Sequence, residues 1–188
     1  PQAGGRGVLV VVNDDIHGAR GLTKSSTTDV QAFVSAERGL MGATLYGENR
    51  YFRRPYRRHT SGSEFSVEGA AALPRVDIVY ISAGFSPDLI DSAVASGARG
   101  LVIAGVGNGN MNQAALAAAG RAVQQGVVVV RSTRVPSGLV GRNLEIDDDR
   151  FGTVASGELN PAQSRVLLKL ALMHNADAAK VQGYFDAY

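Results

Sequence analysis

Short runs of almost continuously apolar residues mark the most regular parts of the chain. They cover residues 8–12, 76–81, 100–106 and 126–130, and polar or glycine-rich segments separate them. A strand with one solvated face alternates apolar and polar residues, whereas a strand buried on both faces is apolar throughout. The pattern therefore predicts four buried strands.

Helical patterns lie between and after the last three runs. Residues 87–96 carry an apolar stripe at helical spacing, and residues 110–125 are rich in alanine and stop at a glycine. Two further amphipathic stretches cover residues 162–174 and 177–184. The order strand, helix, strand, helix, strand predicts an α/β fold, in which crossover helices connect the strands of a parallel sheet.

The first third of the chain breaks this alternation. Residues 46–51 are predicted to form a hairpin with a polar turn, and the basic residues 50–63, interrupted by proline and glycine, are predicted to form a linker. A buried parallel strand at residues 8–12 needs parallel neighbours and covering helices. Because fewer than ten residues precede it, we expect the chain to start inside a domain, so that either the missing strands lie in another segment or the chain is a fragment.

Composition narrows the function classes. The chain has 188 residues and no cysteine, which excludes a thiolate nucleophile and cysteine-ligated zinc or iron–sulfur sites. Its 19 Lys and Arg against 17 Asp and Glu leave a net charge of only +2, which does not by itself indicate nucleic-acid binding. The three histidines are scattered without the spacing of metal ligands, so no metal site is predicted.

Two segments follow predicted strands, at the edge where open α/β sheets bind ligands. Gly105–Asn110 either cradles an anion with backbone N–H groups or forms a tight turn whose asparagine caps the next helix. We favour the turn, because Asn110 stands where the dinucleotide-binding motif needs glycine. Arg131–Gly138 supplies arginines that either hold carboxylates in a bidentate manner or fix the loop through backbone carbonyls.

Each of three charged segments has a functional interpretation and an alternative interpretation without a functional role. Lys24 stands among Ser and Thr hydroxyls, where it is either a desolvated base or a solvated loop residue. The acidic segment from Glu145 to Asp149 lacks the spacing of a calcium loop, which favours a solvated charge run. The basic cluster Arg53–His59 either holds a phosphate backbone or is a solvated or interface-paired strap, and we favour the strap.

Taken together, the motifs resemble those of the bacterial type II L-asparaginases and their glutaminase-asparaginase relatives. The resemblance keeps its order through nearly the whole chain and is more specific than any single motif. The resembling segments are residues 7–14 (GVLVVVND), 23–28 (TKSSTT), 59–61 (HTS), 73–76 (LPRV), 104–110 (AGVGNGN), 130–136 (VRSTRVP) and 155–161 (ASGELNP).

The resemblance implies a domain organisation. Family members are longer, and their amino-terminal domain carries T-G-G-T-I-type and T-D-T-type threonine motifs that these residues do not contain. Residues 1–52 then correspond to the end of that domain, residues 53–74 to an interdomain linker, and residues 75–188 to the carboxyl-terminal domain. A signal peptide, as in periplasmic members, would lie upstream, which implies a periplasmic or secreted location.

The resemblance also implies an activity. In the family a threonine attacks the side-chain amide, ammonia leaves, and water hydrolyses the acyl-enzyme. Lys24 corresponds by position to the catalytic lysine. Asn110 corresponds to a residue near the substrate's α-amino and α-carboxylate groups, and Glu145 corresponds to a carboxylate that meets the substrate ammonium. In the family both come from the adjacent subunit of a homotetramer arranged as a dimer of dimers. The threonine would lie outside these residues, so we expect them to be inactive alone.

The expected function is therefore L-asparaginase, with L-glutamine as a weaker substrate and with no metal, organic cofactor, nucleic-acid or membrane partner. The alternative is a non-catalytic amino-acid-binding or assembly fragment of the same fold. The two threonine motifs in the upstream coding sequence would favour the enzyme. A nucleic-acid binder that uses residues 50–58 is the least favoured interpretation.

Overall fold

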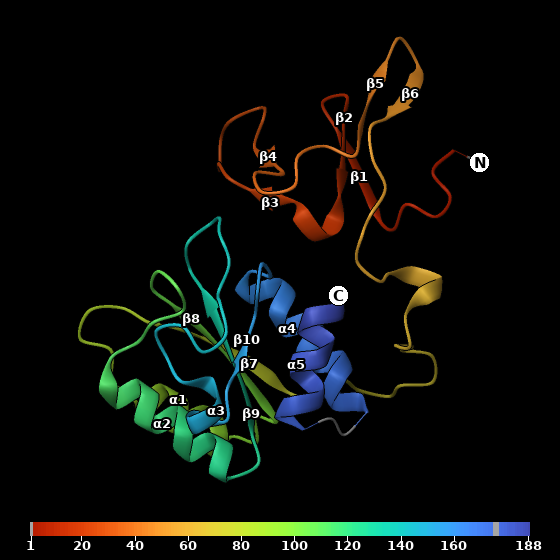
Figure 1. Cartoon of the computed structure of the whole chain (residues 1–188). Coiled ribbons are helices and arrows are strands. Elements are labelled where there is room, and N and C mark those ends of the chain that lie inside the picture. Colours follow the sequence, from red (N-terminus) through yellow and green to blue (C-terminus); the bar gives the residue numbers. More distant parts are fainter. Residues whose placement is uncertain (1, 175–176) are drawn as a thin grey trace. The chain divides into compact units, whose positions relative to one another are not determined.

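A computed structural model describes residues 2–174 and 177–188 of the chain. The chain divides into two compact units, shown in Figure 1. The amino-terminal unit runs to Glu64 and includes Tyr188, and the carboxyl-terminal unit comprises Phe65–Ala187. The division falls within the stretch 53–74.

The amino-terminal unit contains an antiparallel sheet of four strands in the order β1-β2-β5-β6. β5 and β6 form the hairpin predicted at residues 46–51, with Gly42 opposite Tyr51. Tyr46 and Gly47 both have positive φ, as in the type I′ turns that suit the twist of hairpins. The strands are β1 (Leu9–Val12), β2 (Asp15–Gly18), β5 (Gly42–Leu45) and β6 (Glu48–Tyr51).

The strand predicted at residues 8–12 is present, but the prediction of a parallel strand buried on both faces is wrong. β1 lies at the edge of its sheet and pairs antiparallel with β2. Val8 and Val11 are 64% and 60% exposed. The physical reason is the turn, because Asn13 and Asp14, both at positive φ, send the chain straight back. A two-residue connection permits only antiparallel pairing.

A separate two-stranded sheet holds the segment around Lys24. β3 (Thr23–Lys24) and β4 (Phe33–Val34) pair antiparallel. The loop between them is closed by Ser25, whose N–H and hydroxyl both donate to the carbonyl of Ala32. The unit also contains two short 3-10 helices, η1 (Ala19–Gly21) and η2 (Thr60–Gly62).

A parallel four-stranded sheet in the order β10-β9-β8-β7 forms the centre of the carboxyl-terminal unit. β7, β8 and β9 are adjacent both in the chain and in the sheet, and a helix connects each to the next. The predicted α/β fold with crossover helices is confirmed. The strands are β7 (Val76–Tyr80), β8 (Gly100–Gly105), β9 (Val128–Thr133) and β10 (Val154–Ala155).

Helices cover both faces of this sheet, as Figure 1 shows. α1 (Asp88–Ala95) and α2 (Gln113–Gln124) lie on one face, because two successive right-handed crossovers in one direction place their helices on the same side. α4 (Pro161–Met173) covers the other face, with α5 (Ala178–Ala187) beside it against β10. This double cover explains the nearly continuous apolar runs in the sequence.

Successive side chains along each strand point to opposite faces of the sheet. Ile103 belongs to the buried cluster formed with α1 and α2. A Cβ added at Gly100, by contrast, would lie 2.7 Å from a methyl group of Leu168 in α4. Because side chains alternate along a strand, Arg131 of β9 shares the α1/α2 face with Val129 of the same cluster.

In the carboxyl-terminal unit two described elements were not predicted, and one strand is longer than predicted. α3 (Asp148–Phe151) and β10 are too short to produce a periodic pattern of apolar residues. β9 continues to Thr133, beyond the run at residues 126–130, because Arg131 and Ser132 are fully buried although they are polar. Polar residues at the end of an apolar run conceal the strand's true length.

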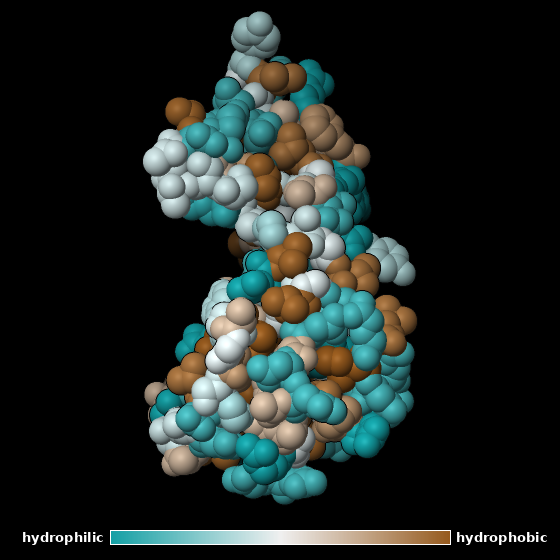
Figure 2. All heavy atoms as spheres, turned by 90° about the vertical axis from the view of Figure 1, so that its left-hand side faces the viewer, coloured by the Kyte–Doolittle hydropathy of each residue, from teal (hydrophilic) through white to brown (hydrophobic). Residues whose placement is uncertain are grey.

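Apolar residues are interspersed with polar ones on the face shown in Figure 2. Scattered apolar exposure of this kind is ordinary for a globular protein and does not mark a site. Within residues 2–174 and 177–188, no helix has the length and apolarity needed to cross a membrane.

Gly105, the last residue of β8, provides a test of the packing. A Cβ there would lie 2.5 Å from the carbonyl carbon of Gly109 and 2.6 Å from the carbonyl oxygen of Asn110, both backbone atoms. We expect Gly105→Ala to lower the free energy of unfolding by about 1–3 kcal/mol, as overpacking does, measured by urea denaturation.

Gly120→Ala is the matched control, because its Cβ would meet only Phe151, at an ordinary 3.6 Å. Within α2 it should stabilise by about 0.5–1 kcal/mol. Equal stability of the Gly105→Ala protein and the parent would contradict the tight packing of this turn.

Candidate functional site

The candidate site lies at the carboxyl edge of the parallel sheet, where open α/β sheets bind ligands. β8 ends at Gly105 and β9 ends at Thr133. The turn that follows β8 (residues 105–110) and the loop that leads from β9 to α3 (residues 134–147) contribute the side chains. We call these segments the glycine turn and the acidic loop.

The glycine turn is a tight reversal of the backbone. The N–H of Val106 donates to the carbonyl of Asn110 over 2.9 Å, and the N–H of Asn110 donates back over 2.8 Å. Gly107 and Gly109 both have positive φ, which explains the glycines. The tight-turn interpretation is confirmed, and the Asn110 N–H is already occupied rather than directed at an anion.

The cap of the following helix is not Asn110 but Asn112. The side-chain oxygen of Asn112 accepts from the N–H of Ala115 over 2.8 Å, and α2 begins at Gln113 rather than at the predicted residue 110. The side chain of Asn110 is therefore not used in capping the helix.

Asn110 and Glu145 are in direct contact although 35 positions separate them in the chain. The side-chain amide of Asn110 donates a hydrogen bond to the Glu145 carboxylate. Glu145 is exposed and Asn110 is half-buried, so both are open to solvent. A carboxylate retains acceptor capacity after one such bond, and the amide oxygen adds another acceptor. The pair can therefore accept hydrogen bonds from an ammonium group.

An ion pair that is almost completely buried contacts the same two segments. The Nε of Arg131 donates to Oδ1 of Asp148 and its Nη2 donates to Oδ2, each over 2.6 Å. The two side chains are 1% and 0% exposed. This fork-to-fork arrangement is the strongest geometry available to arginine and a carboxylate.

The same guanidinium also contacts both segments of the site. Its Nη1 donates to the carbonyl of Asn108 over 3.1 Å and, more weakly, to that of Gly109 over 3.5 Å. Its Nη2 donates to the carbonyl of Gly141 over 3.1 Å. Of the two roles left open for these arginines, Arg131 fulfils both.

Asp148 has further donors. Its carboxylate accepts from the Thr153 hydroxyl over 2.5 Å and from the backbone N–H of Asn143 over 2.9 Å. Burial by itself would raise the pKa of Asp148, but the hydrogen bonds from Arg131 and Thr153, with that N–H and the positive charge, lower it below the ordinary value. Asp148 is therefore a carboxylate at neutral pH.

The interpretation of the acidic segment as a solvated charge run is wrong for Asp148, whereas Glu145, Asp147 and Asp149 are exposed. Asp148 is buried, Asp147 accepts from the N–H of Arg150 and caps α3, and Asp149 pairs with Arg142. Each carboxylate has a structural partner because the segment turns into a helix start. Sequence reasoning missed Asp148, since adjacent aspartates give no sign of which one is buried.

Lys24 lies in the amino-terminal unit, in β3 opposite Phe33. It is exposed, and its Nζ lies 5.8 Å from the centre of the Phe33 ring. Burial among hydroxyls, which one interpretation required, is not observed. Of the three predicted site residues, the structure brings Asn110 and Glu145 together and describes Lys24 in the other unit.

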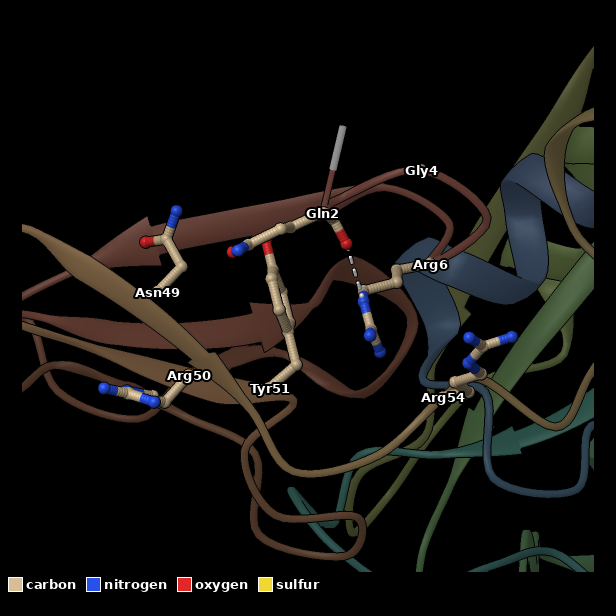
Figure 3. A pocket seen from close by; sticks show the side chains of 7 residues that line it. All are labelled: Gln2, Gly4, Arg6, Asn49, Arg50, Tyr51 and Arg54. Carbon is tan, nitrogen blue, oxygen red and sulfur yellow. Dashed lines mark hydrogen bonds between the residues drawn. The ribbon is translucent and has the colours of Figure 1, made fainter.

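A depression of about 480 Å³ in the amino-terminal unit is lined partly by the basic cluster. Arg6 stacks 4.2 Å from the centre of the Tyr51 ring and donates to the carbonyl of Arg53 over 2.8 Å. Arg50 pairs with Glu48 over 2.6 Å. Figure 3 shows Arg50 and Arg54 directed apart on either side of Tyr51, so the guanidinium groups do not converge on one anion.

Within the part of the chain that the structure describes, no group of three or more His, Cys, Asp or Glu side chains is arranged to hold a metal ion.

Comparisons with known proteins match both units. Residues 75–185 match the family model described as the glutaminase/asparaginase C-terminal domain, and residues 1–57 match the model described as asparaginase, N-terminal. These matches confirm the family resemblance of the sequence motifs.

Three curated relatives are similar over nearly the whole chain. A probable periplasmic L-asparaginase of Haemophilus influenzae is 43% identical over 187 residues, covering 100% of this chain and 54% of that protein. L-asparaginase 2 of Escherichia coli is 44% identical over 183 residues, covering 97% and 53%. The glutaminase-asparaginase of Acinetobacter glutaminasificans is 38% identical over 190 residues, covering 100% and 57%. The chain thus spans about half the length of these relatives.

The Arg131–Asp148 pair makes stability depend on pH. Because the folded state lowers the pKa of Asp148, its ionisation contributes stability that is complete above the ordinary value of 3.8 and is lost as the pH falls through the lower folded value. Asp148→Asn should cost about 3–5 kcal/mol at neutral pH, because it leaves a buried guanidinium without its counter-charge.

Urea denaturation of both proteins across the acid range measures this. The difference in free energy of unfolding should shrink as the pH falls below 3.8. A difference that stays constant throughout the acid range would contradict the role of the ionised carboxylate.

Proposed function

Because the chain belongs to the glutaminase/asparaginase family, we propose that it forms part of an L-asparaginase. The reaction is hydrolysis of the side-chain amide of L-asparagine to L-aspartate and ammonia, with L-glutamine as a weaker substrate. The observation that carries this proposal is the contact between Asn110 and Glu145, which joins an amide and a carboxylate at the carboxyl edge of the parallel sheet.

The chemistry of this pair suits the invariant part of such substrates. An α-amino acid presents an ammonium beside a carboxylate, and only the side chain differs between asparagine and glutamine. Glu145 supplies a negative charge for the ammonium, and Asn110 supplies both a donor and an acceptor. Recognition by these two residues therefore favours α-amino acids as a class and leaves the amide-bearing side chain to other groups.

The catalytic step requires a nucleophile and a proton relay. In the proposed mechanism a threonine hydroxyl, outside these residues, attacks the amide carbon, and its proton passes through the relay to the leaving ammonia. Water then hydrolyses the ester, which releases L-aspartate and restores the threonine. Lys24 takes the relay role by its position in Thr23-Lys24-Ser25, and its exposed ammonium is accessible to such partners.

Assembly and location belong to the same proposal. We infer a homotetramer built as a dimer of dimers, in which Asn110 and Glu145 complete the site of the adjacent subunit. The exposure of Glu145 is consistent with a side chain that serves a neighbouring molecule. The similarity to a probable periplasmic L-asparaginase of Haemophilus influenzae supports a periplasmic or secreted location.

A second candidate function is a non-catalytic amino-acid-binding or assembly fragment of the same fold. It is favoured by one observation, that residues 1–188 contain neither of the two threonine motifs. The two functions differ once these residues are joined to the amino-terminal half of the Escherichia coli relative. This hybrid, which we call the completed enzyme, releases ammonia from asparagine if the first proposal holds.

Lys24→Met in the completed enzyme tests the relay. Methionine keeps the length of the side chain and removes the ionisable amine, so turnover should fall about 100-fold or more, while the unfolding temperature stays unchanged. Lys180→Met is the matched control, because Lys180 is also exposed and its Nζ lies 6.0 Å from an aromatic ring, that of Tyr184. Turnover of Lys24→Met within a few-fold of the parent would refute the assignment.

Glu145→Gln tests recognition of the ammonium. The change removes the charge and keeps the shape, and a charge-assisted hydrogen bond contributes about 1.5–3 kcal/mol. The kcat/KM for asparagine should therefore fall about 10–100-fold, whereas that for succinamate, which lacks the α-amino group, should barely change. Glu68→Gln, at another exposed carboxylate of the same unit, should leave both substrates unaffected. Equal losses on the two substrates would indicate that Glu145 has only a structural role.

A further inference from the structure

Arg131 uses its whole set of donors at one point of the fold. A guanidinium has five N–H donors, and five hydrogen bonds are observed: two to Asp148 and one each to the carbonyls of Asn108, Gly109 and Gly141. These acceptors come from three separate segments, the glycine turn, the acidic loop and the start of α3. A planar fork holds its partners in one fixed arrangement.

These hydrogen bonds fall close in the chain to Asn110 and Glu145, the two residues proposed to bind the substrate. Asn108 and Gly109 immediately precede Asn110 in the glycine turn. Gly141 and Asp148 lie on either side of Glu145 in the chain, and the carboxylate of Asp148 also holds the backbone N–H of Asn143. None of the hydrogen bonds of Arg131 described above goes to Asn110 or Glu145. Arg131 therefore acts on these two residues through the backbone of their segments.

A direct link between the two segments reinforces this arrangement. The side-chain oxygen of Asn108 accepts from the N–H of Gly141 over 2.8 Å. The carbonyls of these same two residues are the ones that Arg131 bonds at 3.1 Å. The glycine turn and the acidic loop are thus linked here in two ways. One link is the direct hydrogen bond between Asn108 and Gly141, and the other is the buried guanidinium, which bonds the carbonyls of both residues.

We propose that Arg131 is a positioning residue of the site: held by Asp148, it fixes the glycine turn and the acidic loop at the separation at which Asn110 and Glu145 meet. The expected effect on substrate binding rests on the proposed function, whereas the expected effect on the contact between Asn110 and Glu145 does not. The proposal concerns geometry, because the buried arginine is too enclosed to touch a substrate.

Lysine at this position would keep the charge but lose the fork. A single ammonium is a point charge that cannot satisfy Asp148 in a bidentate manner and also hold carbonyls of two segments in a plane. Arg131→Lys should therefore release the two segments from each other. Asp148→Asn, which keeps the shape but not the charge, should do the same from the other side of the pair.

The first arm of the test uses the 188-residue chain and no substrate. The side-chain amide signal of Asn110 in nitrogen-15 NMR spectra reports its contact with Glu145, and Glu145→Gln gives the signal position without the carboxylate. In Arg131→Lys and Asp148→Asn the Asn110 signal should move towards that position. Arg121→Met, which breaks an exposed ion pair to Asp91 in the same unit, is the matched control and should leave it unmoved.

The second arm measures kinetics in the completed enzyme. Misplacement of a binding group by about 1 Å costs about 100-fold, so Arg131→Lys should lower kcat/KM for asparagine by up to that factor and kcat/KM for succinamate by clearly less, because succinamate loses only the contact with Asn110. Combined with Glu145→Gln it should cause little additional loss, because both changes remove the same interaction. Thr153→Val removes only one hydrogen bond to Asp148, so it should give a smaller loss of kcat/KM that again affects asparagine more than succinamate. This variant takes the place of the others if they fail to fold.

The outcomes separate the two proposals. An Asn110 signal unmoved in folded Arg131→Lys or Thr153→Val overturns the positioning role, whatever the kinetics. A moved signal with no selectivity between the two substrates in Glu145→Gln leaves the positioning role standing and refutes the proposed function. A selective loss in Glu145→Gln together with an unselective loss in Arg131→Lys shows that Arg131 serves stability alone and overturns the proposal.

Discussion

A buried guanidinium needs a counter-charge and an acceptor for each of its donors, and this requirement at Arg131 organises the functional edge of the carboxyl-terminal unit. Removing two charges from water is costly, and a buried pair persists only when its remaining hydrogen-bonding capacity is satisfied. Asp148 satisfies the charge, and the backbone carbonyls of the glycine turn and the acidic loop satisfy the remaining donors. Two irregular segments thereby acquire a definite arrangement.

The α/β sheet makes this arrangement possible. Arg131 extends β9 past its apolar run on the face that α1 and α2 cover, so its side chain is enclosed at the point where β8 and β9 end. The glycine turn leaves β8 beside it, and Gly105 allows the backbone of Gly109 and Asn110 to approach where a Cβ would not fit. Rigid strands set the positions at which the chain leaves the sheet, and the buried pair sets how the two departing segments meet.

The sequence alone was sufficient for much of the fold. Nearly continuous apolar runs predicted β7, β8 and β9, because helices cover both faces of their sheet. The polar segment at residues 46–51 predicted a hairpin, which β5 and β6 form around Tyr46-Gly47. The same rule failed for β1, whose direction is set by the turn at Asn13-Asp14 and not by its composition. The roles assigned to Asn110 and Glu145 came only from the family resemblance, and the hydrogen bond between them was not predicted. Nothing in the run Asp147-Asp148-Asp149 distinguishes the buried aspartate, because its partner lies 17 residues away at the end of a strand.

The most direct measurement is native-state hydrogen exchange on the 188-residue chain without substrate. Two loop amides report the arrangement: Gly141, which donates to the side chain of Asn108, and Asn143, which donates to Asp148. If the buried pair makes the glycine turn and the acidic loop one rigid element, both amides should exchange as slowly as those of the central strand β8, because they open only when the unit unfolds. Exchange at Gly141 and Asn143 as fast as at the exposed neighbour Leu144 would contradict the account.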